Sequence, residues 1–542
     1  MKLSSAVAAM CLVAASAPWL SAQIVSSTLT GTVVDPANAV IAGADASLKD
    51  QATGAERSAK TNGEGSFRFL DIGAGTYTLT IKASGFSTHV QKDIEVQTSA
   101  TRDIGRVAMA LGNITDQITV TADAANIELS SSEKSHAVDI TQIENMPTRG
   151  RDIFQFIGTL PGMIDTNNAN TGVGTGSHDF RNAYSVGGLS MNGNTSMMNV
   201  TVDGLTGMDV GCGNCLLEGN PNMDAVAEVK ILSSNYSAEY GRNSGGTITL
   251  ATKSGTQAFH GSGWWTHRHE EFNANSFFNN IGGAPRPKYR FNISGYSIGG
   301  PVYIPHKFNT GRTKLFFFAS EEWSALFPGA SLVQKNMPTA LERAGDFSQS
   351  VDTNGKLIKV VDPENGVQFT NNQIPQSRFD PTGVGVKILN FFPLPNYAPA
   401  PGTPNYRKYN YQALIGGQHP IRNDVARVDM NPTSKIAAYI RMVRDDDKTT
   451  DPQAGFDFVY SPQTHPLPSY NYSGAITWTI RPTLVNEFNV GKAGSDWNYY
   501  YNDPSNLVRS VFNNPPKLFP VDFNDPSTVS SLSGSNLHMY NF

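Results

Sequence analysis

One short segment carries the pattern of a catalytic nucleophile. Residues Gly295–Gly299 read GYSIG and fit the G-x-S-x-G motif of hydrolases with a serine nucleophile. That motif works only at a sharp turn between a strand and a helix. The flanking stretches YRFNIS and GPVYIP have strand character, and Pro301 and Pro305 exclude a helix start of the required kind. We therefore predict a strand here and no enzyme.

Two other clusters have residue types that bind metal ions. His267, His269 and Glu271 lie on one face if WTHRHEEF is a strand, and two histidines at this spacing could bind a metal. We interpret them as a polar, lumen-facing row on a barrel strand, with metal binding as the alternative. The acidic run 445–447 (DDD) lacks the glycine and the terminal glutamate of an EF-hand, so we predict a solvated hairpin turn. We expect no cofactor and no metal.

Cys212 and Cys215, in GCGNCL, are the cysteines that remain after removal of the predicted signal peptide. In an exported protein such a pair predicts a small loop-closing disulfide. A redox motif would sit beside a βαβ unit, and a zinc site would need two further ligands. The local sequence favours neither alternative.

The N-terminus indicates export. Lys2, the apolar stretch 3–17 and the triplet 20–22 (LSA) form a signal peptide over residues 1–22. Since no later stretch approaches the ~20 apolar residues of a membrane helix, the mature chain is either soluble outside the inner membrane or a β-barrel. Charged residues make up 16% and glycine is plentiful, which is typical of an all-β protein. The net charge of −5 without a basic block gives nucleic-acid binding no support.

Residues 23–112 predict a small β-sandwich. Short alternating runs are separated by turn signals such as DPAN, TNGEG and IGAG. Phe67 and Phe69 share one face of their run, as do Tyr77, Leu79 and Ile81. The predicted strands are LTGTVVD, ASLKD, SFRFL, GTYTLTI and KDIEV.

Residues 113–254 predict a compact α+β domain. Asp139 and Gln142 have the spacing of a capping box at the start of a short helix. A second helix has Ile153, Phe156, Ile157 and Leu160 on one face and ends at Pro161-Gly162. Strand patterns follow in YSVGGLSMNG, MNVTVDGL, AVAEVKIL and GGTITLATKSG.

Residues 255–542 alternate in segments of about 10 residues, the pattern of a membrane-spanning barrel. Aromatic clusters at 264–265, 316–318 and 499–501 are candidates for interfacial girdles. A large soluble β-domain is the alternative. The predicted strands are GSGWWTHRHEEF, YRFNISGYSIGGPVYIP, RTKLFFFASEEW, NDVARVDM, KIAAYIRMVRD, YSGAITWTI and LVNEFNVGKAG.

The first region resembles carboxypeptidase regulatory-like domains, which belong to the carbohydrate-binding-like group of transthyretin-type sandwiches. The resemblance carries over no catalytic residue. It is carried by Gly31-Thr32-Val33, Asp35, Gly43-Ala44, Thr53-Gly54, Thr61-Asn62-Gly63, Phe67, Gly75-Thr76-Tyr77 and Gly85-Phe86.

The order of regions, with NVTVDGL (199–205) and the stretch 220–262, resembles a TonB-dependent outer-membrane receptor of the Oar-like kind. Residues 422–447 and 477–491 resemble its recurring barrel hairpins. The resemblance implies a mainly β protein with a periplasmic sandwich, a plug and part of an outer-membrane barrel. It also implies import of an extracellular ligand, glycan or siderophore-like, energised by TonB. An adhesion or surface-organisation protein and an exported carbohydrate-binding protein are the alternatives.

The segment DQITVTA resembles the TonB box, which pairs with TonB as an added strand. An extended, β-branched segment suits β-augmentation, which uses mainly backbone groups. The alternative is the last strand of the sandwich. The resemblance assigns to the box Asp116, Gln117, Ile118, Thr119, Val120, Thr121 and Ala122.

In the plug region, Arg149 and Arg151 could pair with carboxylates of the barrel wall and hold the plug. Receptors of this kind have about 22 strands. The 287 residues beyond 255 (542 − 255) accommodate roughly 8–12 strands at about 10 residues each plus loops. We therefore expect an incomplete gene product, with Phe542 as a chance ending.

Overall fold

The computed structural model describes residues 27–112, 117–121, 132–165, 189–209, 217–451 and 463–501. Within these ranges it leaves out 146–147, 149, 159, 196–197, 276, 278–279, 281–284, 329–330, 382, 404–405, 416, 482–483 and 497–499. The described fold is mainly β, as predicted. None of its helices is long and apolar enough to cross a membrane.

The N-terminal strands form a sandwich of two sheets, ordered β4-β1-β7 and β3-β2-β5-β6-β8. Leu29, Phe67, Phe69, Leu79 and Ile81 are buried together between them, so the predicted faces are confirmed. All five predicted strands are present. The strands are β1 (Ser27–Val34), β2 (Asp45–Asp50), β3 (Glu56–Lys60), β4 (Ser66–Ile72), β5 (Gly75–Lys82), β6 (Thr88–Val96), β7 (Thr101–Ala108) and β8 (Gln117–Thr121).

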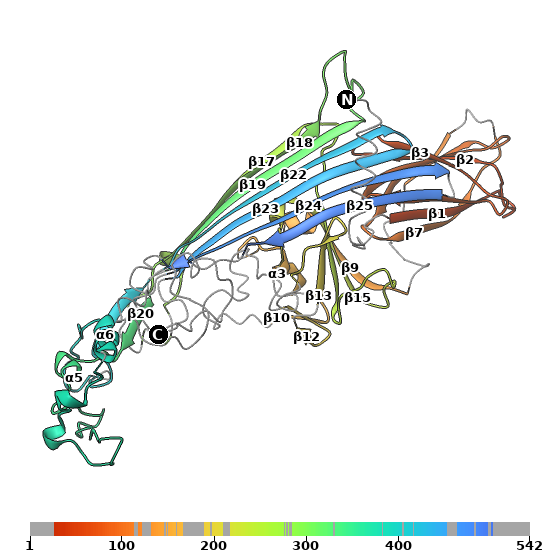
Figure 1. The fold of residues 1–542 in the computed structure, drawn as a ribbon. Helices are drawn as coiled ribbons and strands as arrows, with labels where there is room; N and C mark the ends of the chain where they lie inside the picture. Colours follow the sequence, from red (N-terminus) through yellow and green to blue (C-terminus); the bar gives the residue numbers. More distant parts are fainter. Residues whose placement is uncertain are drawn as a thin grey trace, which may run out of the picture.

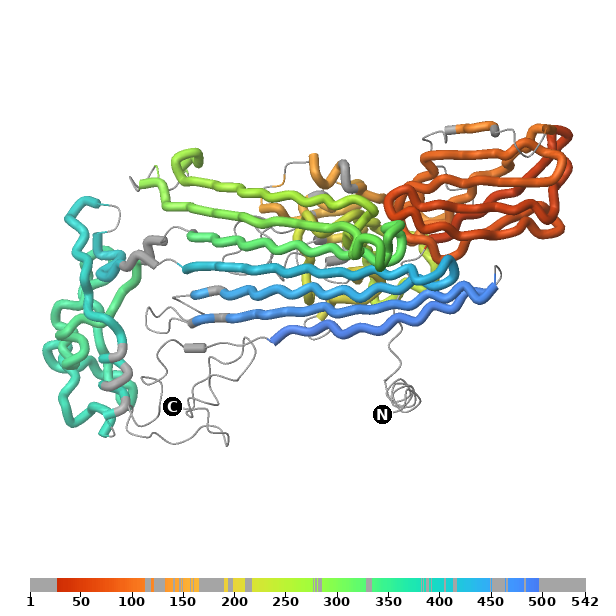
Figure 2. Tube along the Cα trace, turned by 90° about the horizontal axis from the view of Figure 1, so that it is seen from above, coloured from red at the N-terminus to blue at the C-terminus, as the bar shows by residue number. Residues whose placement is uncertain are grey.

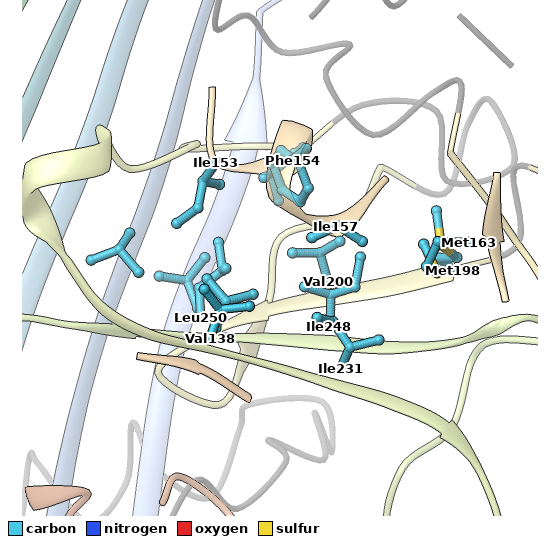
Figure 3. Close-up of a cluster of buried hydrophobic side chains, with 14 of the residues drawn as sticks. Val138, Ile153, Phe154, Ile157, Met163, Met198, Val200, Ile231, Ile248 and Leu250 are labelled. Atoms are coloured by element: carbon cyan, nitrogen blue, oxygen red, sulfur yellow. The ribbon is translucent and has the colours of Figure 1, made fainter. Parts of the chain in front are cut away.

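The second unit, called the plug below, packs two short helices on a five-stranded sheet ordered β14-β13-β16-β15-β9. Figure 3 shows Phe154 and Ile157 above Val200 and Ile248 in its core. The predicted capping box is confirmed, because the Gln142 backbone N–H donates to the Asp139 carboxylate over 2.8 Å. The elements are β9 (Lys134–Asp139), α2 (Ile140–Asn145), α3 (Phe154–Ile157), β13 (Met198–Val202), β14 (Leu205–Thr206), η1 (Met223–Ala225), β15 (Val226–Ser234) and β16 (Gly246–Thr252), beside a small sheet of β10 (Met163–Asp165), β11 (Leu189–Met191) and β12 (Asn194–Thr195).

Seven long strands then form a twisted antiparallel sheet, called the wall, in which neighbours along the chain pair in sequence (Figure 1). Each of the seven segments predicted as a barrel strand is one of these strands. They are β17 (His260–His269), β18 (Tyr289–Pro301), β19 (Leu315–Pro328), β22 (His419–Thr433), β23 (Ile436–Asp451), β24 (Gln463–Arg481) and β25 (Leu484–Ser495). The short β26 (Tyr500–Tyr501) pairs with β24, and η2 (Glu270–Phe272) follows β17.

A separate module connects β19 to β22 and lies at the end of the wall opposite the sandwich (Figures 1 and 2). The antiparallel pair of β20 (Ser331–Lys335) and β21 (Tyr411–Ile415) joins it to the wall. Thr339 and Glu342 form a capping box at the start of α5. The module contains α5 (Ala340–Arg343), η3 (Thr370–Asn372), η4 (Gln376–Arg378) and α6 (Val384–Phe391).

Candidate functional site

The plug meets the inner face of the wall through buried polar groups, and Asp203 is the centre of the first contact. Asp203 occupies the turn between β13 and β14. Its carboxylate lies 3.1 Å from the Arg427 guanidinium and 2.9 Å from Arg441 Nε. The Thr252 backbone N–H and hydroxyl donate to it over 2.9 and 2.7 Å. Burial raises the pKa of Asp203, but the two guanidiniums and the Thr252 hydrogen bonds outweigh it and hold that pKa below its ordinary value.

The wall arginines bind more of the plug than this carboxylate. Arg441, whose side chain is 0% exposed, donates to the Val202 carbonyl over 2.9 Å. It also donates to Asn471 Oδ1 on the neighbouring strand over 2.8 Å. The Arg441 Nε–Asp203 contact lacks the alignment of a hydrogen bond and is an ion pair. The Tyr439 hydroxyl donates to the Asp203 carbonyl over 2.8 Å, so side chain and backbone of this turn are both held.

In a second contact, side chains of the wall bind the backbone of the plug loop 219–222. The Asn220 backbone N–H donates to the Asp445 carboxylate over 2.8 Å. The Asn222 backbone and side-chain amides both donate to Asn423 Oδ1, over 2.9 and 2.8 Å. The prediction of a solvated hairpin turn at 445–447 is therefore wrong, because these residues continue strand β23. The strand persists through the charges since Asp445 faces inward and finds backbone donors there.

A third contact confirms the expected role of Arg151, whereas Arg149 lies outside the described residues. The Arg151 guanidinium pairs with Asp224 of the plug and, over 3.2 Å, with Glu322 of β19. It also lies 5.0 Å from the ring centre of Trp264 on β17. A small apolar cluster adds to these polar contacts, formed by Ala225 of the plug with Phe318, Val425 and Val443 of the wall.

Trp264 also sets the orientation of the histidine row on β17. Its indole N–H donates to Glu322 over 3.1 Å on the plug side of the wall. Since side chains alternate along a strand, His267 and His269 face the opposite, outer side, where His267 stacks on Trp265. The predicted lumen-facing row is therefore wrong, and Glu271 belongs to η2. Within the described ranges, no cluster of three or more His, Cys, Asp or Glu could hold a metal ion.

The GYSIG segment lies inside β18, paired on both sides, as predicted. The Ser297 hydroxyl lies 2.8 Å from the Ser262 hydroxyl across the strand pair. This segment is therefore not a turn between a strand and a helix, which a nucleophile elbow requires.

The sandwich binds the plug through two buried charged residues of β15. The Glu228 carboxylate accepts the Thr98 backbone N–H over 2.9 Å, and burial raises the pKa of this carboxyl. The Lys230 ammonium donates to the Ser99 carbonyl over 2.8 Å and pairs with Glu133 over 2.9 Å. Both contacts hold the turn between β6 and β7, so this turn is fixed to the plug sheet.

The segment that resembles a TonB box is strand β8, and it pairs in parallel with β6 at the end of the sandwich sheet. This pairing corresponds to the alternative of a last sandwich strand, and the binding of this segment to TonB stays a prediction. Ile118 and Val120 are each 42% exposed. Asp116 and Ala122 lie outside the described residues, as do Cys212 and Cys215 with their predicted disulfide.

A cavity of about 570 Å³ lies where sandwich, plug and wall meet. Asp50 and Tyr77 line it from the sandwich, Thr252 from the plug, and Arg427 and Glu487 from the wall. No pattern in the sequence predicted this site, because its residues come from three separate regions of the chain.

Comparisons with known proteins agree with this architecture. Residues 251–537, more than half of the chain, match the outer membrane beta barrel domain, and residues 28–111 match the carboxypeptidase regulatory-like domain. Over 255 residues the chain is 26% identical to the TonB-dependent transporter Oar of Myxococcus xanthus. This match covers 44% of the chain but only 21% of that relative's length.

Two solved structures are similar at low sequence identity. The outer membrane transporter YddB from Escherichia coli is 10% identical, with a TM-score of 0.40, over 68% of this chain and 40% of that one. The siderophore receptor PirA from Acinetobacter baumannii is 11% identical, with a TM-score of 0.31, over 68% and 48%.

Proposed function

Because the chain belongs to the outer membrane beta barrel domain family, we propose that it is a TonB-dependent receptor that imports an extracellular ligand across the outer membrane. Its place in the outer membrane follows from that family and from the similarity to the Oar transporter. The observation that carries the proposal is the plug held against the wall by buried polar groups around Asp203, Asn222 and Arg151.

This kind of interface suits a plug that moves during transport. The net free energy of a hydrogen bond is only about 0.5–1.5 kcal/mol, because water replaces the lost partner once the interface opens. Burial of apolar surface contributes about 25 cal/mol per Å², and this free energy is lost when the interface opens because water does not replace the apolar contacts. Polar contacts therefore hold the plug in one geometry and allow its release under load.

The ends of the molecule have different proposed roles. The module between β19 and β22, residues 331–415, lies opposite the sandwich, so we assign it to the extracellular side (Figure 1). A ligand would bind there and at the apex of the plug. The sandwich and residues 116–122 then lie in the periplasm, where TonB would bind the segment DQITVTA as an added strand.

The test is capture of the full-length chain by the C-terminal domain of TonB, with and without Val120→Pro. Proline removes a backbone donor, so we expect at least about tenfold weaker binding, in line with the ~1–3 kcal/mol lost when a hydrogen-bonding group is left unpaired. Val120→Thr keeps the donor and the β-branched shape and should bind like the unsubstituted chain. Equal capture of all three chains would refute the assignment of residues 116–122 to TonB.

A further inference from the structure

We propose that the sandwich holds residues 117–121 in a docked form that TonB cannot bind, so that TonB binds only after β8 leaves the edge of β6. The inference rests on the proposed function and adds a control step to it. It gives the sandwich a role in controlling the access of TonB to this segment. The family resemblance alone assigns no such role to the sandwich.

The pairing of β8 with β6 is the observation behind this proposal. The two strands pair in parallel over five consecutive positions, from Thr88 opposite Gln117 to Lys92 opposite Thr121. Figure 2 shows β8 as the short orange strand beside the sandwich. A strand that binds by β-augmentation is recognised through its backbone, and one edge of this backbone already faces β6.

The docked strand is held weakly enough to be exchanged. Parallel pairing is slightly less stable per residue than antiparallel pairing, and only five residues take part. Ile118 and Val120 remain 42% exposed, so they contribute only part of the free energy that full burial would supply. The central strands differ, since Leu79 and Ile81 of β5 are fully buried.

Strand β6 cannot move freely with β8 when TonB pulls on β8. Glu228 and Lys230 of the plug strand β15 hold the turn that ends β6, through Thr98 and Ser99. A load applied to docked β8 would therefore act on the pair β6–β8 and on the sandwich.

Release changes the path of that load. Residues 122–133 connect β8 to β9, and β9 pairs with β15 in the plug sheet. Once β8 leaves β6, tension passes along the chain directly into the plug. Productive coupling thus requires the released form.

The inference has a quantitative consequence for TonB binding. When only a fraction of the molecules is competent, the apparent dissociation constant is the intrinsic one divided by that fraction. If docking occupies about nine molecules in ten, TonB binds about tenfold more weakly than to a released segment. A covalent lock on the docked form should therefore remove binding.

The lock is a disulfide between β6 and β8 in the full-length chain, made by Gln91→Cys with Val120→Cys, which are partners in the parallel pair. Paired strands lie within the Cα separation that a disulfide spans. Cys212→Ser and Cys215→Ser remove competing thiols in every variant. The matched control is Lys49→Cys with Thr78→Cys, which links β2 to β5 in the same sheet without touching β8.

We expect the oxidised 91–120 variant to bind the C-terminal domain of TonB at least about tenfold more weakly than its reduced form, because the competent fraction vanishes. The oxidised control should bind like its reduced form. If oxidised and reduced 91–120 variants bind equally, the inference is wrong and the proposed function stands. If no form binds, including the unsubstituted chain, the proposed function itself fails.

Hydrogen exchange on the unsubstituted chain gives a second test that needs no cross-link. Displacement of β8 should lower the protection of backbone amides in residues 88–92 when TonB is added. Unchanged or increased protection there would mean that TonB adds a strand beside docked β8, and would overturn the inference.

Discussion

At the scale of single residues, the ion pairs around Asp203 decide how firmly the plug is held. A buried carboxylate without partners would be strongly disfavoured, and here two guanidiniums and Thr252 compensate for the lost hydration. Arg427 has a further carboxylate, Asp429 on its own strand, at 2.8 Å. Asp203 is therefore the plug carboxylate that pairs with both arginines, whereas Asp429 belongs to the wall.

Asp203→Asn should destabilise the plug against the wall by about 3–5 kcal/mol, because it leaves buried Arg441 without its compensating charge. The measurement is chemical denaturation of the full-length chain in lipid, followed by hydrogen exchange of the plug strands. Asp429→Asn is the matched control, since it removes a carboxylate from the same Arg427 without breaking a contact to the plug. Equal losses in both variants would contradict the role assigned to Asp203.

The same carboxylate predicts a pH dependence. Its pKa is lower in the folded state than its ordinary value of 3.8, so the folded state favours the charged form. The stability that it contributes is therefore fully present above pH 3.8 and is lost as the pH falls through the lowered pKa. Plug protection followed between neutral pH and pH 3 should fall less steeply in Asp203→Asn than in the unsubstituted chain.

At the scale of elements, the wall strands separate two environments. On β23, Arg441 is buried against the plug, whereas the adjacent Ile440 is 66% exposed on the outer face. Other wall strands present further exposed apolar side chains, namely Ile298, Trp323, Ile476, Trp478, Phe488 and Val490. An apolar outer face and a polar inner face are what a wall between lipid and plug requires.

Ile440→Lys should therefore weaken folding into lipid vesicles by up to about 2–4 kcal/mol, the range for a basic residue at the bilayer midplane, which falls toward the interfaces. Urea titration in vesicles, followed by tryptophan fluorescence, measures the change. Ile440→Leu keeps an apolar side chain and should fold like the unsubstituted chain. A lysine variant with unchanged stability would place Ile440 outside the lipid-facing band.

At the scale of the whole molecule, buried polar contacts fix the sandwich to the plug, so the connecting chain is not the only link between them. Glu228 and Lys230 are buried on β15, and they bind backbone groups of the β6–β7 turn. The Gln257 backbone N–H adds a bond to the Ala52 carbonyl over 3.0 Å. These contacts give the sandwich a defined position at one end of the wall (Figure 2).

Glu228→Ala should loosen this arrangement, since the Thr98 N–H loses its acceptor at a cost of about 1–3 kcal/mol. Spin labels at Lys49→Cys and Lys435→Cys, in a Cys212→Ser and Cys215→Ser background, report the distance between sandwich and wall. We expect a broadened distance distribution for Glu228→Ala and a narrow one for Glu228→Gln, which keeps an oxygen acceptor. Identical distributions for both variants would show that other contacts position the sandwich.

The sequence by itself determined the features that neighbouring residues encode. Alternation with period two located all seven wall strands and five sandwich strands, and the spacing of Asp139 and Gln142 located the start of α2. These inferences succeed because strand pattern, capping and turn chemistry depend on residues within a few positions of one another.

The tertiary structure alone decided which face of each wall strand turns toward the plug and which distant residue it meets. The acidic run around Asp445 has the sequence pattern of a solvated turn. Only the fold brings the backbone N–H of Asn220 within hydrogen-bonding distance of the Asp445 carboxylate. His267 faces outward because Trp264, which lies three positions earlier on the opposite face of β17, contacts Glu322 on the plug side. Likewise, β8 is a strand by pattern, and only its register with β6 shows where it docks. The physical reason is that the alternation of side chains along a strand depends on neighbouring residues. Which face of that strand turns inward is set by contacts between residues far apart in the chain.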